Sequence, residues 1–241
     1  MIEVSGLTKL YGDFRAVDDL SFAVKAGEVM GLVGPNGAGK TTTLRCLSGI
    51  IPPGQGKVVI GGHDMAQTPV EAKRLLAFIP DEPKLFDYLT VEEHLRFVAR
   101  LYGADGDPHR AASLLAEMEL TTREKSLPAE LSRGMKQKLS IACGLIHDPR
   151  VLIFDEPLTG LDPAGIRRMK ETIAARAADG CAVVISSHLL SLVEEVCHRV
   201  LVLHGGRKII HGSLEEIAAG LPEMAKDASL EEIFFKVTGT S

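Results

Sequence analysis

Residues Gly34–Thr41 read GPNGAGKT, and this short stretch decides the fold. It matches the phosphate-loop pattern G-x-x-x-x-G-K-[ST] in full. The apolar run Val29–Val33 precedes it, and a segment with helical character begins at Lys40. A loop of this kind between a buried strand and a helix predicts an α/β fold built around a phosphate-binding site.

The residue types of this loop suit a triphosphate. Glycines allow backbone N–H groups to turn inward, and the start of the following helix adds positive potential. Lys40 would reach the β and γ phosphate oxygens, and the Thr41 hydroxyl would ligate Mg²⁺. We expect the phosphate contacts to come from one continuous run: Gly34, Pro35, Asn36, Gly37, Ala38, Gly39, Lys40, Thr41 and Thr42.

A second apolar run, VLIF, ends in Asp155 and Glu156. After a buried strand, Asp155 could hold Mg²⁺ through water, and Glu156 could polarise an attacking water. Taken alone, these acids could equally be surface residues that follow a strand. The phosphate loop in the same chain favours the catalytic role. Guanine-specific enzymes usually carry Asn-Lys-x-Asp, and the only asparagine here is Asn36, so ATP is the expected nucleotide.

The order of segments outlines one α/β domain with an insertion. Strand-like segments open the chain, residues 85–148 read as a mostly helical block, and strand–helix alternation resumes at VLIF. Capping boxes at Thr90, Ser213 and Ser229 predict helix starts. We place the domain at residues 1–220 and a short C-terminal helical tail at residues 221–241.

Composition narrows the class of protein. The chain has 241 residues, 45% of them hydrophobic, and a net charge of −5, so we expect a sizeable core and no nucleic-acid partner. Its four cysteines form no C-x-x-C pair and have no zinc-ligand spacing, which favours buried free thiols in a reducing compartment. We find no signal peptide and no apolar run long enough to span a bilayer.

The stretch Leu131–Leu139, LSRGMKQKL, looks at first like an ordinary helix start. Ser132 is a good N-cap, and taken alone that is the simpler interpretation. The stretch is also the first of an ordered series: LSRGMKQK, then VLIFDEPLTGLDP, then VVISSH. With the phosphate loop, this series resembles the ATP-binding subunits of ABC transporters over nearly the whole chain. SRGMKQK and PDEPKLF most resemble the ABC-2 exporter type.

The resemblance implies a P-loop NTPase core with an antiparallel β subdomain and an inserted α-helical subdomain at roughly residues 85–148. It also implies that two subunits dock head to tail around ATP. Ser132 and the Gly134 backbone N–H of one chain would then donate to the γ-phosphate held by the other. His188 would contact that phosphate and order Glu156, although a lone histidine at such a position is more often a helix-end hydrogen-bonding group.

Three further positions follow from the resemblance. Tyr11 matches the aromatic residue that stacks on adenine, with Val17 as its apolar companion. Tyr11 could instead be a simple core residue of the β subdomain. Asp162 would belong to the loop that couples the two sites across the dimer, and it also has the sequence context of a helix N-cap, so both roles can hold.

The sequence departs from the family pattern at two places. Asp81 stands where the family usually has a glutamine that ligates Mg²⁺. Aspartate can also ligate the ion, but it is shorter and adds a charge. Arg133 and Met135 replace the common glycine and glutamine of the signature stretch. The serine and the phosphate-facing glycine remain, so we expect retained activity, with Thr41, Asp81 and Asp155 as metal ligands.

The function implied is an ATP-hydrolysing motor subunit that drives a separate transmembrane permease. We expect a second copy as its dimer partner and a location on the cytoplasmic face of the inner membrane. Glu156 would be the general base, helped by Lys40, Mg²⁺ and His188. Apolar residues near residue 81 would either dock the permease or pack locally: Leu85, Phe86, Tyr88 and Leu89. Two alternatives stay open, namely a soluble ABC-type ATPase outside transport and a regulatory module that binds ATP but barely hydrolyses it.

Overall fold

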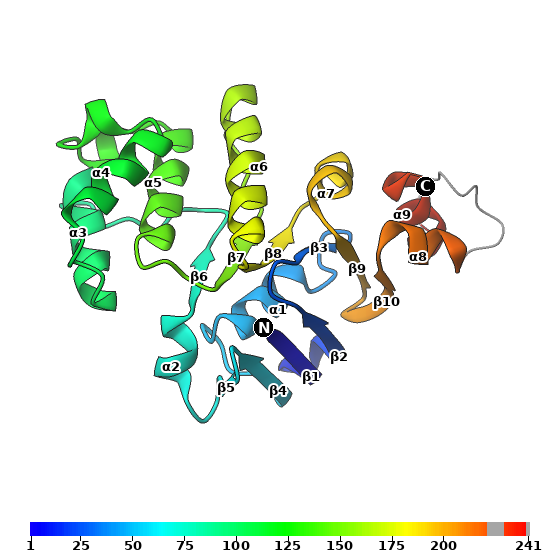
Figure 1. Cartoon of the computed structure of the whole chain (residues 1–241). Coiled ribbons are helices and arrows are strands. Elements are labelled where there is room, and N and C mark those ends of the chain that lie inside the picture. The colour runs from blue at the N-terminus through cyan, green and yellow to red at the C-terminus, as the bar shows by residue number, and fades with distance from the viewer. Residues whose placement is uncertain (221–228, 240–241) are drawn as a thin grey trace.

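The strands form two separate sheets in the computed structural model, which describes residues 1–220 and 229–239 (Figure 1). The smaller sheet is antiparallel, with the order β2-β1-β4-β5. The larger sheet has the order β10-β9-β3-β8-β7-β6 and is parallel except for the β9–β10 hairpin. The strands are β1 (Ile2–Tyr11), β2 (Phe14–Val24), β3 (Val29–Val33), β4 (Gln55–Ile60), β5 (His63–Asp64), β6 (Leu76–Ile79), β7 (Val151–Asp155), β8 (Ala182–Ser186), β9 (Arg199–His204) and β10 (Arg207–Gly212).

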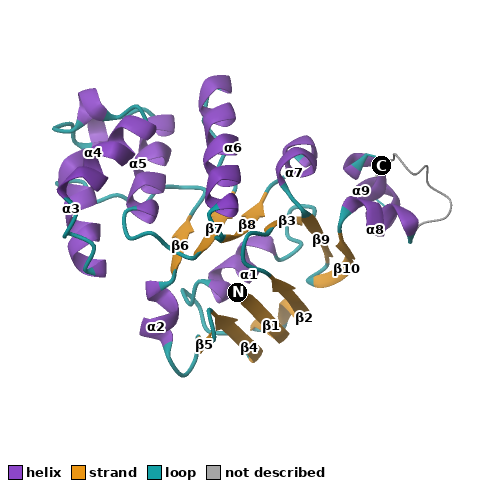
Figure 2. Ribbon diagram, viewed as in Figure 1, coloured by secondary structure: helices purple, strands orange, loops and turns teal. Residues whose placement is uncertain are grey.

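Helices cover the larger sheet and form a block beyond its β6 edge (Figure 2). Within the described ranges, none of them is both long enough and apolar enough to cross a bilayer. The α-helices are α1 (Lys40–Leu47), α2 (Pro69–Arg74), α3 (Val91–Tyr102), α4 (Pro108–Glu117), α5 (Arg133–Leu145), α6 (Pro163–Ala178), α7 (Leu190–Val196), α8 (Leu214–Ala219) and α9 (Leu230–Thr238).

The three central parallel strands position the chemistry. Every residue of β3, β7 and β8 is buried, as expected for strands with both faces covered. Parallel strands end at the same edge of a sheet, and ligands of open α/β sheets bind there. Gly34 follows β3, Glu156 follows β7, and Ser187 and His188 follow β8. The motifs that are far apart in sequence therefore meet at one edge.

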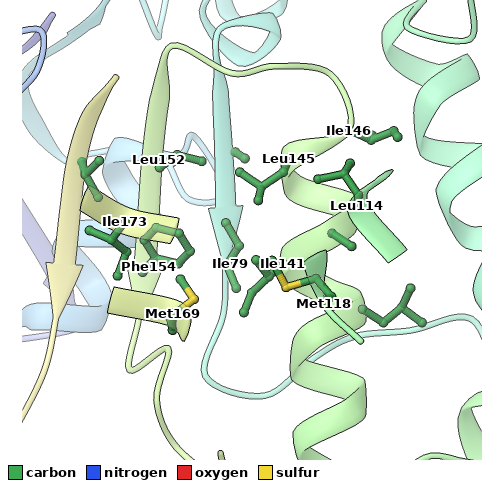
Figure 3. Close-up of a cluster of buried hydrophobic side chains, with 14 of the residues drawn as sticks. Ile79, Leu114, Met118, Ile141, Leu145, Ile146, Leu152, Phe154, Met169 and Ile173 are labelled. Carbon is green, nitrogen blue, oxygen red and sulfur yellow. The ribbon is translucent and has the colours of Figure 1, made fainter. Parts of the chain in front are cut away.

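The helical block shares a continuous core with the larger sheet (Figure 3). Leu114 comes from α4, Ile141 and Leu145 from α5, and they pack against Ile79 of β6 and Phe154 of β7. On the other side of the sheet, α1 lies between the two sheets, because the cluster that holds its apolar side chains draws on both. The helical block is thus anchored by apolar packing rather than by its connections alone.

Most of the expected elements are present. The capping boxes at Thr90, Ser213 and Ser229 form as predicted. The short elements α2 and β5 were missed. In the predicted tail, α9 packs with α7, β9 and α8 in one apolar cluster, while residues 221–228 and 240–241 lie outside the described residues. The division at residue 220 stays a prediction.

Candidate active site

The loop after β3 is built for close backbone approach. Gly39 is the N-cap of α1 at φ 100°, a conformation that favours glycine, and an added Cβ there would lie 2.4 Å from the Ala16 carbonyl oxygen. Lys40 Nζ donates to the carbonyl oxygens of Gly34 at 2.7 Å and Pro35 at 3.3 Å. Burial lowers the pKa of Lys40, and the Glu156 carboxylate partly offsets this. The lysine charge is therefore held within the loop.

The metal ligands predicted on α1 and β7 converge. Thr41 Oγ1 donates to Asp155 Oδ1 at 3.3 Å, and Ser186 Oγ donates to the same oxygen at 2.6 Å. Asp155 is only 5% exposed. A hydroxyl beside a buried carboxylate fits Mg²⁺, which prefers oxygen and keeps substrate phosphates and water in its shell. In the described part of the chain, no group of three or more His, Cys, Asp and Glu side chains could cage a metal, so phosphate oxygens would complete this one.

Glu156 is held in an unusual backbone conformation beside His188. Its φ of 50° lies in the left-handed region, which costs a non-glycine residue about 1–3 kcal/mol and is often found at functional sites. Glu156 N–H donates to the Ser186 carbonyl at 3.2 Å. Glu156 Oε2 accepts from the His188 N–H at 3.3 Å and lies 2.8 Å from His188 Nδ1. The histidine thus orients the carboxylate.

A cavity of about 310 Å³ extends from the phosphate loop and Glu156 to the end of the β1–β2 hairpin. Glu156 lines it together with Asn36–Thr42, Tyr11, Phe14 and Ala16. Tyr11 is 48% exposed, so it is not a core residue, and the Lys9 ammonium lies 5.6 Å from its ring centroid. Phe14 is also exposed, and the sequence analysis missed it.

The structure contradicts the expectation that Val17 lies beside the base. Its side chain is fully buried and does not line the cavity, whereas Ala16 does. The reason is an irregularity in the β1–β2 ladder: Lys9 pairs with Val17, but the next residue, Leu10, pairs with Arg15. One extra residue in a strand reverses which side chains face each side.

The signature stretch lines a different cavity, of about 480 Å³. Ser132 Oγ accepts from Met135 N–H at 3.3 Å and Asp162 Oδ1 accepts from Gly165 N–H at 2.8 Å, so both residues are N-caps. The Gly134 backbone packs under the loop before α6, since an added Cβ would lie 3.0 Å from the Gly160 carbonyl oxygen. The lining residues are Ser132, Arg133, Gly134, Met135, Lys138, Gly160, Leu161 and Asp162. None of them lines the phosphate-loop cavity.

Asp81 lies between these regions. It lines a third cavity, of about 370 Å³, together with Thr41, Asp155 and Glu156, and its role as a metal ligand stays a prediction. Its Oδ1 also lies 3.7 Å from Arg133 Nη2. Both positions depart from the family pattern, and nothing in the sequence predicts that they pair.

The apolar residues after Asp81 divide between the two roles considered for them. Phe86 is 54% exposed and Tyr88 is 92% exposed. Leu85 and Leu89 are half-buried, and Leu85 packs against the helical block. Phe86 also contributes to an apolar groove of about 580 Å³ between β6, α3 and α5. A surface for another protein is therefore available here.

Comparisons with known proteins point to one family. The family profile described as ABC transporter matches residues 17–159. The ABC-type transporter ATP-binding protein EcsA of Bacillus subtilis (strain 168) is 33% identical over 240 residues, 99% of this chain and 96% of that protein. The Nod factor export ATP-binding protein I of Burkholderia orbicola (strain AU 1054) is 38% identical over 214 residues, 88% of this chain and 70% of that protein.

A solved structure shows the same fold. The ATP-binding subunit of an ABC transporter superposes with a TM-score of 0.92 at 36% identity, over 98% of this chain and 99% of that one. The fold class expected from the sequence is confirmed. The chain belongs to the ABC transporter family and is one of its ATP-binding, ATP-hydrolysing subunits.

Proposed function

We propose that this subunit is the motor of an exporter: it binds Mg²⁺·ATP, closes on a second copy of itself and drives a separate transmembrane permease. The proposal rests on one observation: Lys40, Asp155, Glu156 and His188 lie together at one edge of the larger sheet. The direction of transport is supported by the relative named for Nod factor export.

Each residue has a defined task in this proposal. The phosphate loop and Lys40 bind the triphosphate. Thr41 and Asp155 would hold Mg²⁺, which neutralises phosphate charge when it is bound. Glu156 accepts a proton from the attacking water, and His188 keeps the carboxylate oriented toward it. Tyr11 provides an exposed ring on which the base can stack, with Phe14 beside it.

A second copy is required because one chain contains the two halves of the site in separate cavities. Ser132 and the N-terminal end of α5 face the second cavity with no phosphate-loop residue beside them. In a head-to-tail dimer, the Ser132 hydroxyl and the Gly134 N–H of each chain would reach the γ-phosphate bound by the other. The permease would dock at the groove beside Phe86 and place the subunit at the cytoplasmic face of the membrane.

Steady-state turnover tests the catalytic role. Glu156→Gln removes the proton acceptor and should lower turnover by about 10²- to 10⁴-fold while ATP affinity is retained. Lys57→Gln, which removes the exposed lysine of the Lys57–Asp64 ion pair far from the nucleotide cavity lining, is the matched control and should leave both turnover and ATP affinity unchanged. If the wild-type protein turns over as slowly as Glu156→Gln, the chain is a regulatory nucleotide-binding module and the motor proposal fails.

Mixing two inactive variants tests the shared site. A mixed dimer of Lys40→Ala and Ser132→Asp chains keeps one site with an intact phosphate loop and an intact signature, so activity should reappear on mixing. A mixture of Lys40→Ala and Glu156→Gln leaves a defect in both sites and should stay inactive. Equal activity in the two mixtures would contradict a head-to-tail dimer.

Binding to a permease separates transport from a soluble ATPase. The membrane protein encoded by the adjacent reading frame, reconstituted in vesicles, should carry this subunit to the vesicle fraction and raise its turnover. Phe86→Asp should weaken that binding without changing ATP affinity, because Phe86 lines the groove and not the nucleotide cavity. If the subunit neither binds these vesicles nor changes its turnover in their presence, the soluble alternative is favoured.

A further inference from the structure

One ion pair connects two cavities that otherwise have no lining residue in common. Asp81 lines the cavity that contains the metal ligands Thr41 and Asp155. Arg133 lines the signature cavity, next to Ser132. Arg133 Nη2 lies 3.7 Å from Asp81 Oδ1. A charge change on the metal side therefore has a direct route to the signature side of the same chain.

Glycine at position 160 lets the arginine reach this partner. An added Cβ on Gly160 would lie 2.9 Å from Arg133 Cδ and 3.1 Å from its Cγ, so the stem of the arginine rests on the loop before α6. A side chain at 160 would displace it. The neighbouring carboxylate, Glu82, is already paired with Lys84 at 2.5 Å. Asp81 is thus the carboxylate that Arg133 contacts directly.

The contact satisfies Asp81 only in part. Within the described residues, its Oδ1 has no hydrogen-bond donor, although that atom is closed to solvent. A separation of 3.7 Å is an ionic contact and too long for a hydrogen bond. The two side chains are 62% and 47% exposed, so the pair is worth little in free energy. A carboxylate held this weakly is available to a stronger cation.

We propose that Asp81 exchanges between Arg133 and the Mg²⁺ that accompanies ATP, so that nucleotide loading of a subunit releases Arg133 into its own signature cavity. The inference rests on the proposed function. In the structure, Asp81 pairs with the guanidinium of Arg133, whose stem lies across Gly160. When Asp81 turns to the metal, the freed guanidinium lies beside Ser132, where its planar donors suit the triphosphate carried by the partner. A loaded subunit is thereby prepared for docking.

The test measures ATP affinity in the Glu156→Gln background, at dilutions that keep the protein monomeric, once with Mg²⁺ and once with EDTA. Arg133→Gln frees Asp81 and should strengthen binding in Mg²⁺ by about two- to five-fold, the range that an exposed ion pair supplies, with no change in EDTA. In Asp81→Asn protein, the same substitution should add nothing. Arg133→Lys keeps the charge and should bind like the parent. Arg96→Gln removes one partner of an equally exposed ion pair in α3 and should have no effect.

A charge-swapped variant distinguishes exchange from a structural tether. Asp81→Arg with Arg133→Asp rebuilds the ion pair but removes the carboxylate that faces the metal. If the ion pair is only a structural tether, the swapped variant should bind ATP in Mg²⁺ as tightly as the parent protein. If Asp81 exchanges, the swapped variant should bind ATP in Mg²⁺ more weakly than the parent. The inference is overturned by recovery in the swap, by an Arg133→Gln effect that persists in EDTA or in Asp81→Asn, or by no effect of Arg133→Gln in Mg²⁺. If the parent protein binds ATP no better with Mg²⁺ than with EDTA, the proposed function is contradicted instead.

Discussion

The loop Gly34–Thr41 and the stretch Leu131–Leu139 both place a helix start where an anion could bind, yet only the first is part of a finished pocket. The phosphate loop has Tyr11 and Glu156 across a shared cavity. The signature stretch has an exposed Ser132 and faces mainly its own helix and the loop before α6. A helix N-terminus attracts phosphate in both cases, but the groups that complete the site differ. The difference supports the proposal that the second stretch is half of a site shared between two subunits.

The two regions also differ in how firmly they are packed. At Gly34, an added Cβ would lie 2.4 Å from the backbone oxygen of Leu203 and 2.8 Å from Ala38 Cβ. At Gly160, the nearest atoms belong to the flexible side chain of Arg133. Gly34 therefore faces backbone, which cannot move aside, whereas Gly160 faces a side chain that can.

Lys40→Ala should have the largest effect, because it breaks the finished pocket without touching the core. We expect turnover to fall by about 10³-fold and ATP affinity to fall with it, since a buried cation that faces the phosphates is lost. The thermal midpoint should change little, because Lys40 bonds only to the carbonyls of its own loop. Turnover and scanning calorimetry measure the two effects. Unfolding on substitution would show that the lysine also stabilises the fold.

Glycine substitutions compare the two regions in free energy of unfolding. Gly34→Ala should cost about 3 kcal/mol, because the added methyl group meets backbone that has no room to shift. Gly160→Ala should cost about 1–2 kcal/mol, mainly from its φ of 82°, since Arg133 can move aside. Urea unfolding measures both. Equal losses would mean that the loop before α6 is as rigid as the phosphate loop.

The finished pocket was predictable from sequence because its parts follow general rules. The phosphate loop is a contiguous motif, and the ends of parallel strands meet at one edge, which brings Asp155, Glu156 and His188 together. Val17 was misplaced because an irregular strand pairing sets which side chains face the base. Phe14 was missed for the same reason. The Asp81–Arg133 pair depends on how the helical block is oriented on the sheet, and no local pattern encodes that.

Substitution of Ser132 separates its two roles. Ser132→Ala loses the N-cap and should cost about 1 kcal/mol in stability, together with about a tenfold loss of turnover. Ser132→Asp keeps a good cap, so stability should be retained, but its negative charge would face the partner's phosphate and abolish turnover. Urea unfolding and ATPase assays, run side by side, give the two readouts. A stable and active Ser132→Asp protein would show that the residue is a cap and nothing more.

The smallest effect concerns one thiol in each region: Cys46 is buried, and Cys143 is half-buried beside the apolar groove. Burial raises the pKa of Cys46 in α1 from 9.0 to about 11, and that of Cys143 in α5 from 9.0 to about 12. Both thiols are almost wholly neutral below about pH 8 in the folded and unfolded chain, so they change stability little there. As pH rises above 9.0, the unfolded chain ionises first and stability falls, until the folded thiol ionises as well.

Cys46→Ala and Cys143→Ala should therefore each lose less stability than the wild type between pH 7.5 and pH 10, by about 1 kcal/mol. Urea midpoints at the two pH values measure this. Each protein is compared with itself at the two pH values, so the pH-independent cost of the cavity left by the substitution cancels. If the two variants differ from the wild type by the same amount, the helical block shields Cys143 from water at high pH as well as the sheets shield Cys46. An effect for Cys46 alone would mean that the block opens at high pH before the sheet unfolds, as expected if the signature region is the adjustable half of the molecule.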